Sequence, residues 1–277
     1  MRFGHILHAL YCEPWLIDPA MHQQLRQIVD AHITGKAHAP DGNILDFNDK
    51  SGKAPDLKVV DGVAIVSLVG VVGKRIGMME KSSGVMDVDD LSDNIQAALD
   101  RDDVRGILLD VNSPGGTITG VPEAADMVVE AASMKPVVAF TDTLMASAAY
   151  WIAVGADAIV ATQSASIGSI GVYSAMLDSS VAFSNAGLKQ ELFKEGAFKA
   201  MGIQGLPLTA EQREHIQERV TKIYEWFTSS VIEARVQVSK DSMQGQTFRG
   251  ADAKAANLID QIGSKDDAFD LLKELIG

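Results

Sequence analysis

The stretch GILLDVNSPGG, residues 106–116, decides the fold, because it contains a strand-like run that ends at a glycine-rich turn. Aliphatic residues fill positions 107–109, a pattern typical of a buried strand. The two glycines after Pro114 let the backbone approach a ligand with its N–H groups free. A simple tight turn explains the same residues, and neither phosphate-binding glycine motif is matched. A third interpretation is an oxyanion hole, which requires a nucleophile nearby.

Outward from this stretch, strand-like and helix-like segments alternate. This alternation predicts βαβ units, and hence an α/β fold with a mainly parallel sheet covered by helices. Catalytic groups of such sheets collect at the carboxyl ends of the strands. The end of the chain predicts a short strand and two small helices. Strand patterns start near Val59 and cover 106–113, 136–140 and 158–165, whereas helix patterns cover 88–101, 122–134 and 209–236.

The amino-terminal part differs from this body. Residues 18–33 predict a short amphipathic helix with Asp18 as N-cap and Pro19 at its first position. Scattered Gly, Pro, Asp, Asn and Lys over 34–57 indicate a linker. We therefore expect an N-terminal helical arm and linker over 1–57, and a second domain over 58–277.

The composition narrows the class of protein. The chain has 277 residues, 47% of them hydrophobic, which indicates a globular protein with a substantial core. Its formal charge of −13 argues against binding to nucleic acid or to anionic membranes. A single cysteine, Cys12, excludes an internal disulfide and a multi-cysteine metal site. We expect no metal, no cofactor and no transmembrane helix, and a cytoplasmic location.

DTLMASAAYWIA, residues 142–153, supplies a candidate nucleophile. Ser147 follows the strand-like run 136–140 and precedes an apolar helical stretch, which is the strand–turn–helix setting of known serine nucleophiles. A small residue tolerated where a helix packs closely on the sheet explains Ser147 equally well.

A nucleophilic serine needs a proton acceptor, and no histidine occurs between His38 and His215. His215 has surface-like neighbours, so an exposed helix residue is its simplest interpretation. A lysine acts as a base when an apolar pocket lowers the pKa from about 10.4 to roughly 7–8. Of Lys194 and Lys199, the second has the more apolar neighbours, although solvated lysines are common at such positions. Ser169, in SIGSIGV, could hydrogen-bond a neutral amine.

Four ordered blocks resemble a known family. They are GILLDVNSPGG, MASAAYWIAVGADAIVATQSASIGSIGV, LFKEGAFKAMG and the pattern G-x-x-x-x-G-x-x-A-x-x-x-x-L-I-D-x-I-G from Gly245. Together they resemble the signal peptide peptidase A family of Ser/Lys peptidases, and more narrowly its phage capsid-assembly (prohead) proteases. The resemblance, from about residue 59 onward, implies a crotonase/Clp-protease-like fold, peptide-bond hydrolysis and a ring-shaped homo-oligomer.

The resemblance also implies roles for individual residues. Ser147 corresponds to the nucleophile, Lys199 to the general base and Ser169 to a residue that orients the lysine. The N–H of Gly115 or Gly116, with that of Ala148, corresponds to the oxyanion hole. Relatives usually have glycine just after the nucleophile or one position later. Both positions are alanine here, so the chemistry requires a turn with negative φ at them. The lysine could come from the same chain or from an adjacent subunit.

The amino terminus separates two branches of the family. We expect no membrane anchor ahead of the body, and EPWLIDPAMHQQL resembles the start of phage proteases. This implies scaffold, portal or capsid proteins as polypeptide substrates, in the host cytoplasm or the assembling capsid. Three alternatives remain: an anchor-free signal-peptide or quality-control peptidase, a crotonase-type enzyme acting on coenzyme A thioesters, and a non-catalytic assembly component.

Overall fold

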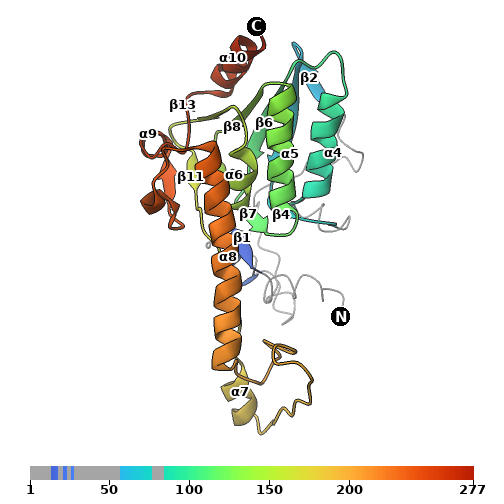
Figure 1. Ribbon diagram of the computed structural model, residues 1–277, viewed down its shortest axis with the longest axis vertical. Helices are drawn as coiled ribbons and strands as arrows, with labels where there is room; N and C mark the ends of the chain where they lie inside the picture. Colours follow the sequence, from blue (N-terminus) through green and yellow to red (C-terminus); the bar gives the residue numbers. More distant parts are fainter. Residues whose placement is uncertain (1–13, 18–20, 24–25, 28–56, 77–83) are drawn as a thin grey trace, which may run out of the picture. The chain divides into compact units, whose positions relative to one another are not determined.

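The computed structural model describes residues 14–17, 21–23, 26–27, 57–76 and 84–277 (Figure 1). The chain forms two compact units. Unit 1 contains 1–15 and 172–226, and unit 2 contains 16–171 and 227–277. The predicted domain boundary at 57/58 stays a prediction, because most of the arm lies outside the described residues. Within the expected helix 18–33, residues 21–23 and 26–27 are helical, and the others lie outside that set.

The largest sheet lies in unit 2 and confirms the predicted parallel arrangement. Its strand order is β13-β10-β8-β6-β3-β2, and all neighbours are parallel except the β2–β3 pair. The strands correspond to the segments expected from the sequence, with β10 shorter because a turn begins at Thr162. Their bounds are β2 Lys58–Val60, β3 Val63–Val69, β6 Gly106–Asn112, β8 Val137–Thr141, β10 Ala158–Ala161 and β13 Gln261–Ile262.

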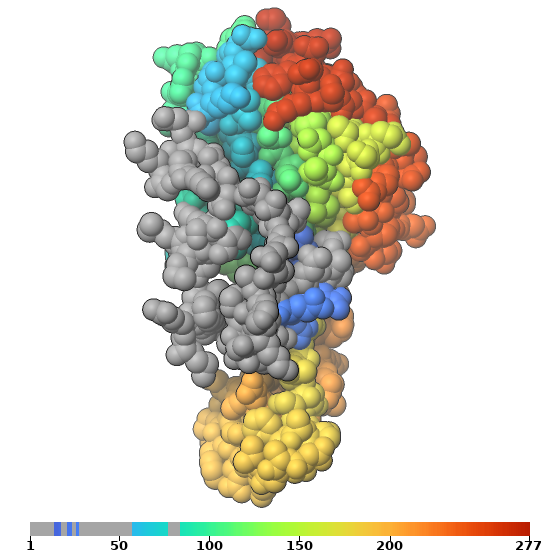
Figure 2. Space-filling model, turned by 180° about the vertical axis from the view of Figure 1, so that it is seen from behind, coloured from blue at the N-terminus to red at the C-terminus, as the bar shows by residue number. Residues whose placement is uncertain are grey.

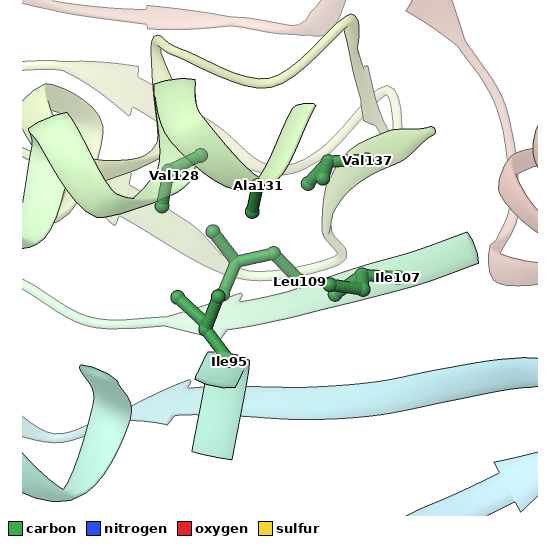
Figure 3. Close-up of a pocket in the computed structure, with 6 residues that line it drawn as sticks. All are labelled: Ile95, Ile107, Leu109, Val128, Ala131 and Val137. Carbon is green, nitrogen blue, oxygen red and sulfur yellow. The ribbon is translucent and has the colours of Figure 1, made fainter. Parts of the chain in front are cut away.

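Both faces of this sheet are covered, because alternate side chains of each strand point to opposite faces. Leu108 contributes to one hydrophobic cluster with Leu272 of helix α10 (Lys265–Ile276). Ile107 and Leu109 point the other way, toward α4 (Val88–Leu99) and α5 (Val121–Met134). Figure 3 shows this second layer, in which the labelled side chains are all hydrocarbon. It is packed core and offers no polar group for chemistry.

Two smaller sheets lie beside the large one at the level where β6 ends. One has the order β1-β7-β4-β5 and the other the order β12-β11-β9. The short helices α6 and α9 follow β9 and β12, and a 3-10 turn, η1, precedes β12. The bounds are β1 Trp15–Ile17, β4 Val71–Gly73, β5 Val85–Asp87, β7 Gly115–Thr117, β9 Leu144–Ala146, α6 Ala148–Ala153, β11 Ser166–Gly168, η1 Lys240–Met243, β12 Thr247–Arg249 and α9 Gly250–Ala255.

Unit 1 contains α7 (Ser180–Asn185) and the first part of α8 (Ala210–Ala234), which continues into unit 2 from Phe227. The predicted capping box of α8 is confirmed. The Thr209 N–H donates to Gln212 Oε1 at 3.1 Å, and the Gln212 N–H donates to Thr209 Oγ1 at 3.2 Å. The two bonds satisfy donors that a helix start leaves unpaired, and so define where α8 begins.

The carboxyl-terminal part of α8 is fixed to α6 by an aromatic pair. The rings of Trp151 and Phe227 stack with centroids 4.6 Å apart and an interplanar angle of 5°. Both side chains are fully buried. Such pairs add about 0.5–1.5 kcal/mol beyond the burial of their area. The stack therefore ties α8 to the helix that directly follows Ser147.

We predict that Phe227→Ala lowers the free energy of unfolding by about 3–5 kcal/mol, because it opens a cavity against Trp151. The matched control is Val129→Ala on α5, where the side chain is 55% exposed. The control should change stability by no more than about 0.5 kcal/mol. Urea unfolding followed by circular dichroism measures both. Equal effects of the two substitutions would contradict the anchoring role.

Candidate functional site

Ser147 lies between a strand and a helix, as the sequence predicted. It follows β9 and immediately precedes α6, and its φ and ψ angles are 55° and −119°. A positive φ costs a residue with a side chain on the order of 1–3 kcal/mol and persists only where the surroundings enforce it. Here the Ser147 N–H donates to the Gly168 carbonyl at 2.7 Å, and the Ser147 carbonyl accepts from the Trp151 N–H at 3.0 Å.

The Ser147 hydroxyl is buried and unpaired. The residue is only 1% exposed, and its Oγ has no hydrogen-bond partner within the described part of the chain. Leaving a buried hydroxyl unpaired costs about 1–3 kcal/mol. Strain and an unpaired polar atom at one residue are features that folded proteins concentrate at functional sites.

The glycine turn lies directly against Ser147. Gly115 has a φ of 94°, and a Cβ placed on it would lie 2.9 Å from both Ser147 Cβ and Ala148 N. A Cβ on Gly116 would lie 1.9 Å from the Val72 carbonyl oxygen. Both positions therefore exclude any side chain. The Gly115 N–H donates to Ser113 Oγ over a long 3.2 Å, and Ser113 Oγ donates to the Gly70 carbonyl at 2.6 Å.

Ala148 begins α6, and the positive φ of the turn falls on Ser147 instead. The negative φ that alanine requires after the nucleophile is therefore present. The first N–H of a helix has no acceptor inside that helix, so the Ala148 N–H is available beside Ser147.

Ser169 directly follows β11, and β11 lies next to β9, the strand that precedes Ser147. β9 and β11 pair in parallel, with Ala146 opposite Gly168, so Ser147 and Ser169 each follow their strand by one residue. Ser169 is 4% exposed and has a φ of 51°, and its N–H donates to the Gln246 carbonyl at 2.8 Å. The two serines thus occupy equivalent positions at neighbouring strand ends.

The structure therefore brings five of the six predicted site residues together in unit 2. Lys199 belongs to unit 1, where it is exposed and lies in a turn whose Lys199 N–H donates to the Gly196 carbonyl at 3.2 Å. His215, also in unit 1, corrects one expectation. It is half-buried, because its ring stacks on Phe198 with centroids 4.4 Å apart.

The sequence did not reveal the residues that hold helix α6, and with it Ser147, in place. All six residues of α6 are buried, and Tyr150 donates its hydroxyl to the Leu258 carbonyl at 2.9 Å. Beside them, the guanidinium of Arg235 donates two hydrogen bonds to Asp260. The only signal in the sequence was the Tyr-Trp pair at 150–151, two large aromatic residues in a stretch otherwise made of small and aliphatic ones.

We also searched the described residues for metal-ligating clusters and for membrane-spanning helices. Among the residues described, no three His, Cys, Asp or Glu side chains cluster so that they could hold a metal ion. In the same part of the chain, no helix combines the length and apolar character needed to cross a bilayer.

Fold and site together define an α/β protein with a serine held on a strained strand-to-helix turn. The model for peptidase family S49 matches residues 130–277, which is more than half of the sequence, so the chain belongs to that family. The predicted resemblance to this family is thereby confirmed.

Individual relatives include phage proteins. Over 98% of its length, the chain is 30% identical to head-tail preconnector protein GP5 of Enterobacteria phage P21, of which it covers 57%. Over 83% of its length, it is 28% identical to capsid assembly protease C of Escherichia phage lambda, of which it covers 53%. The chain thus spans little more than half of either protein. Among solved structures, a ClpP1 mutant from Listeria monocytogenes matches with a TM-score of 0.45 and 15% identity, over 74% of this chain and 93% of that one.

We predict an alkaline loss of stability that depends on Tyr150. Burial raises the pKa of its phenol above the ordinary value of 10. The folded state therefore keeps the phenol neutral, whereas the unfolded chain ionises from about pH 10 upward. Stability should be complete below this pH and fall as the pH rises further.

Tyr150→Phe tests this expectation by chemical denaturation at pH 7 to 11. The variant loses one hydrogen bond, so we expect it to be about 0.5–1.5 kcal/mol less stable at pH 7. Its stability should then fall less steeply than that of the wild type above pH 10. Parallel curves for the two proteins would contradict the prediction.

Proposed function

We propose that the chain is a serine endopeptidase that works through an acyl-enzyme on Ser147. The observation that carries the proposal is the strained Ser147 beside the glycine turn, with a buried hydroxyl that has no hydrogen-bond partner among the described residues. Membership of peptidase family S49 supports it. A crotonase-type enzyme, which only polarises an acyl thioester, would not require a strained serine at this position.

In the proposed mechanism, Ser147 Oγ attacks the carbonyl carbon of the scissile peptide bond. The neutral amine of Lys199 accepts the hydroxyl proton, and the resulting ammonium returns it to the leaving amine. The N–H groups of Ala148 and of Gly115 or Gly116 stabilise the oxyanion. Water, activated by the same lysine, then hydrolyses the ester. Ser169 orients the lysine from the adjacent strand end.

We assign Lys199 to the site of a neighbouring subunit. The segment that carries this lysine is unusually apolar at its surface, which suits contact with a second copy of the chain. Phe193, the most extreme case, is 91% exposed. Figure 2 shows most of this segment in yellow. Its large exposed apolar residues are Leu177, Val181, Leu188, Leu192, Phe193, Phe198 and Ile203. A ring-shaped homo-oligomer would cover them.

The proposed substrates are polypeptides of an assembling phage capsid, such as scaffold, portal or capsid proteins. The printed names of the two phage relatives, a head-tail preconnector protein and a capsid assembly protease, support this role. Such a protein would act in the host cytoplasm or inside the assembling capsid.

The first test measures hydrolysis of β-casein by Ser147→Ala and Lys199→Met. We expect each to lower kcat/KM by at least about 10³-fold, because members of a catalytic dyad act as a unit. The control is Lys194→Met, which removes a charge from the same exposed segment and should leave kcat/KM within about twofold of wild type. Full activity of Lys199→Met would remove this lysine from the mechanism.

The second test mixes the two inactive variants. If Lys199 serves the neighbouring subunit, a one-to-one mixture should regain roughly a quarter of wild-type activity, because half of the sites contain Ser147 and half of their neighbours supply Lys199. Each variant alone stays inactive. No recovery, with subunit exchange shown by mass spectrometry, would place the lysine within its own chain.

A further inference from the structure

Strand β1 was not predicted from the sequence, yet it lies next to the strand that contains the glycine turn. β1 occupies one end of the sheet β1-β7-β4-β5, beside β7 (Gly115–Thr117). Trp15, Leu16 and Ile17 are 4%, 0% and 2% exposed. A segment of three residues is therefore as deeply buried as the core of the protein.

The main chain of Leu16 reaches the nucleophile. A Cβ placed on Gly115 would lie 2.1 Å from the Leu16 carbonyl oxygen, and 2.9 Å from both Ser147 Cβ and Ala148 N. The Leu16 carbonyl, the nucleophile and the first N–H of α6 therefore surround the same small space. In the proposed reaction, the carbonyl groups of a substrate must enter this space.

The contacts of β1 are those of a bound peptide. Extended peptides bind by adding a strand to a sheet, with affinity from main-chain hydrogen bonds and specificity from pockets for the side chains. In the sheet, β1 is hydrogen-bonded to β7, the strand that contains the glycine turn. In unit 2, the Leu16 side chain is fully buried and belongs to the hydrophobic core.

We propose that residues 15–17 occupy the position in which an extended polypeptide substrate binds, and that they must leave before Ser147 can act. This inference rests on the proposed function. It explains why Ser147, whose hydroxyl has no hydrogen-bond partner among the described residues, is only 1% exposed. It also defines the substrate as an extended segment that adds a strand beside β7 and places an aliphatic residue where Leu16 now lies.

Hydrogen exchange tests the displacement without altering the strand. Ser147→Ala in the full chain is saturated with β-casein, binding being followed by fluorescence anisotropy of labelled casein. We expect the amides of residues 15–17 to lose protection by at least about tenfold, whereas those of β6 (Gly106–Asn112) stay unchanged. Unchanged protection at 15–17 with casein bound would overturn the proposal.

A substitution in the strand gives a second readout. Leu16→Asp places a charge in the buried apolar site and should release the segment, which we expect to raise kcat/KM for β-casein at least about fivefold. The control is Val129→Asp, an exposed position on α5, which should leave kcat/KM unchanged. An unchanged or lower kcat/KM in a folded Leu16→Asp protein would overturn the proposal. If that variant does not fold, the exchange experiment decides alone.

The two experiments separate this inference from the proposed function. Casein that removes protection at 15–17, without hydrolysis by wild type or Leu16→Asp, would support the binding site and refute the peptidase. Hydrolysis that depends on Ser147, without loss of protection at 15–17, would support the peptidase and refute the displaced strand.

Discussion

The backbone conformation of Ser147 is the constraint on which the rest of the site depends. Its positive φ turns the chain from β9 into α6 within one residue, and the hydroxyl then lies beside the glycine turn. The conformation is unfavourable by itself. It is maintained from both sides, because the strand ladder holds the Ser147 N–H and the first turn of α6 holds its carbonyl.

Helix α6 can enforce this strain only because it is itself immobilised. Six residues are too few for an independently stable helix. Its stability must therefore come from burial, and every residue of α6 is buried. Trp151 stacks on Phe227, and Tyr150 donates to the Leu258 carbonyl. Residues 227–277 thus support the turn at Ser147, although they contain none of the proposed catalytic groups.

The sequence predicted those parts of the fold that follow from local pattern. The parallel strands, the long helices and the capping box of α8 have periodicities or spacings that few other structures share. The ends of the strands expected over 106–113 and 136–140 were predicted to be neighbours, because parallel strands end at one edge. The structure confirms that Ser147 and the glycine turn lie side by side, whereas β9 and β11, which bring Ser169 next to them, were not predicted as separate strands.

The remaining features depend on contacts between distant segments, which local pattern does not encode. The Trp151–Phe227 stack joins residues far apart in the chain, and either ring would have suited any apolar core. Strand β1 is only three residues long, and it follows Pro14 in the amino-terminal part of the chain, where no strand was expected. Its β-structure comes from its neighbours in the sheet, so a propensity argument could not find it.

The same dependence on neighbours explains how β1 could occupy the proposed substrate position and still be displaced by a substrate. A strand of three residues gains little from its own sequence, and its stability comes from main-chain bonds that any extended chain can make. A longer substrate, with more such bonds and an aliphatic side chain for the site of Leu16, can therefore compete with it. The Ser147 hydroxyl, which has no hydrogen-bond partner in the described part of the chain, favours this exchange, because a bound substrate supplies an electrophile at that point.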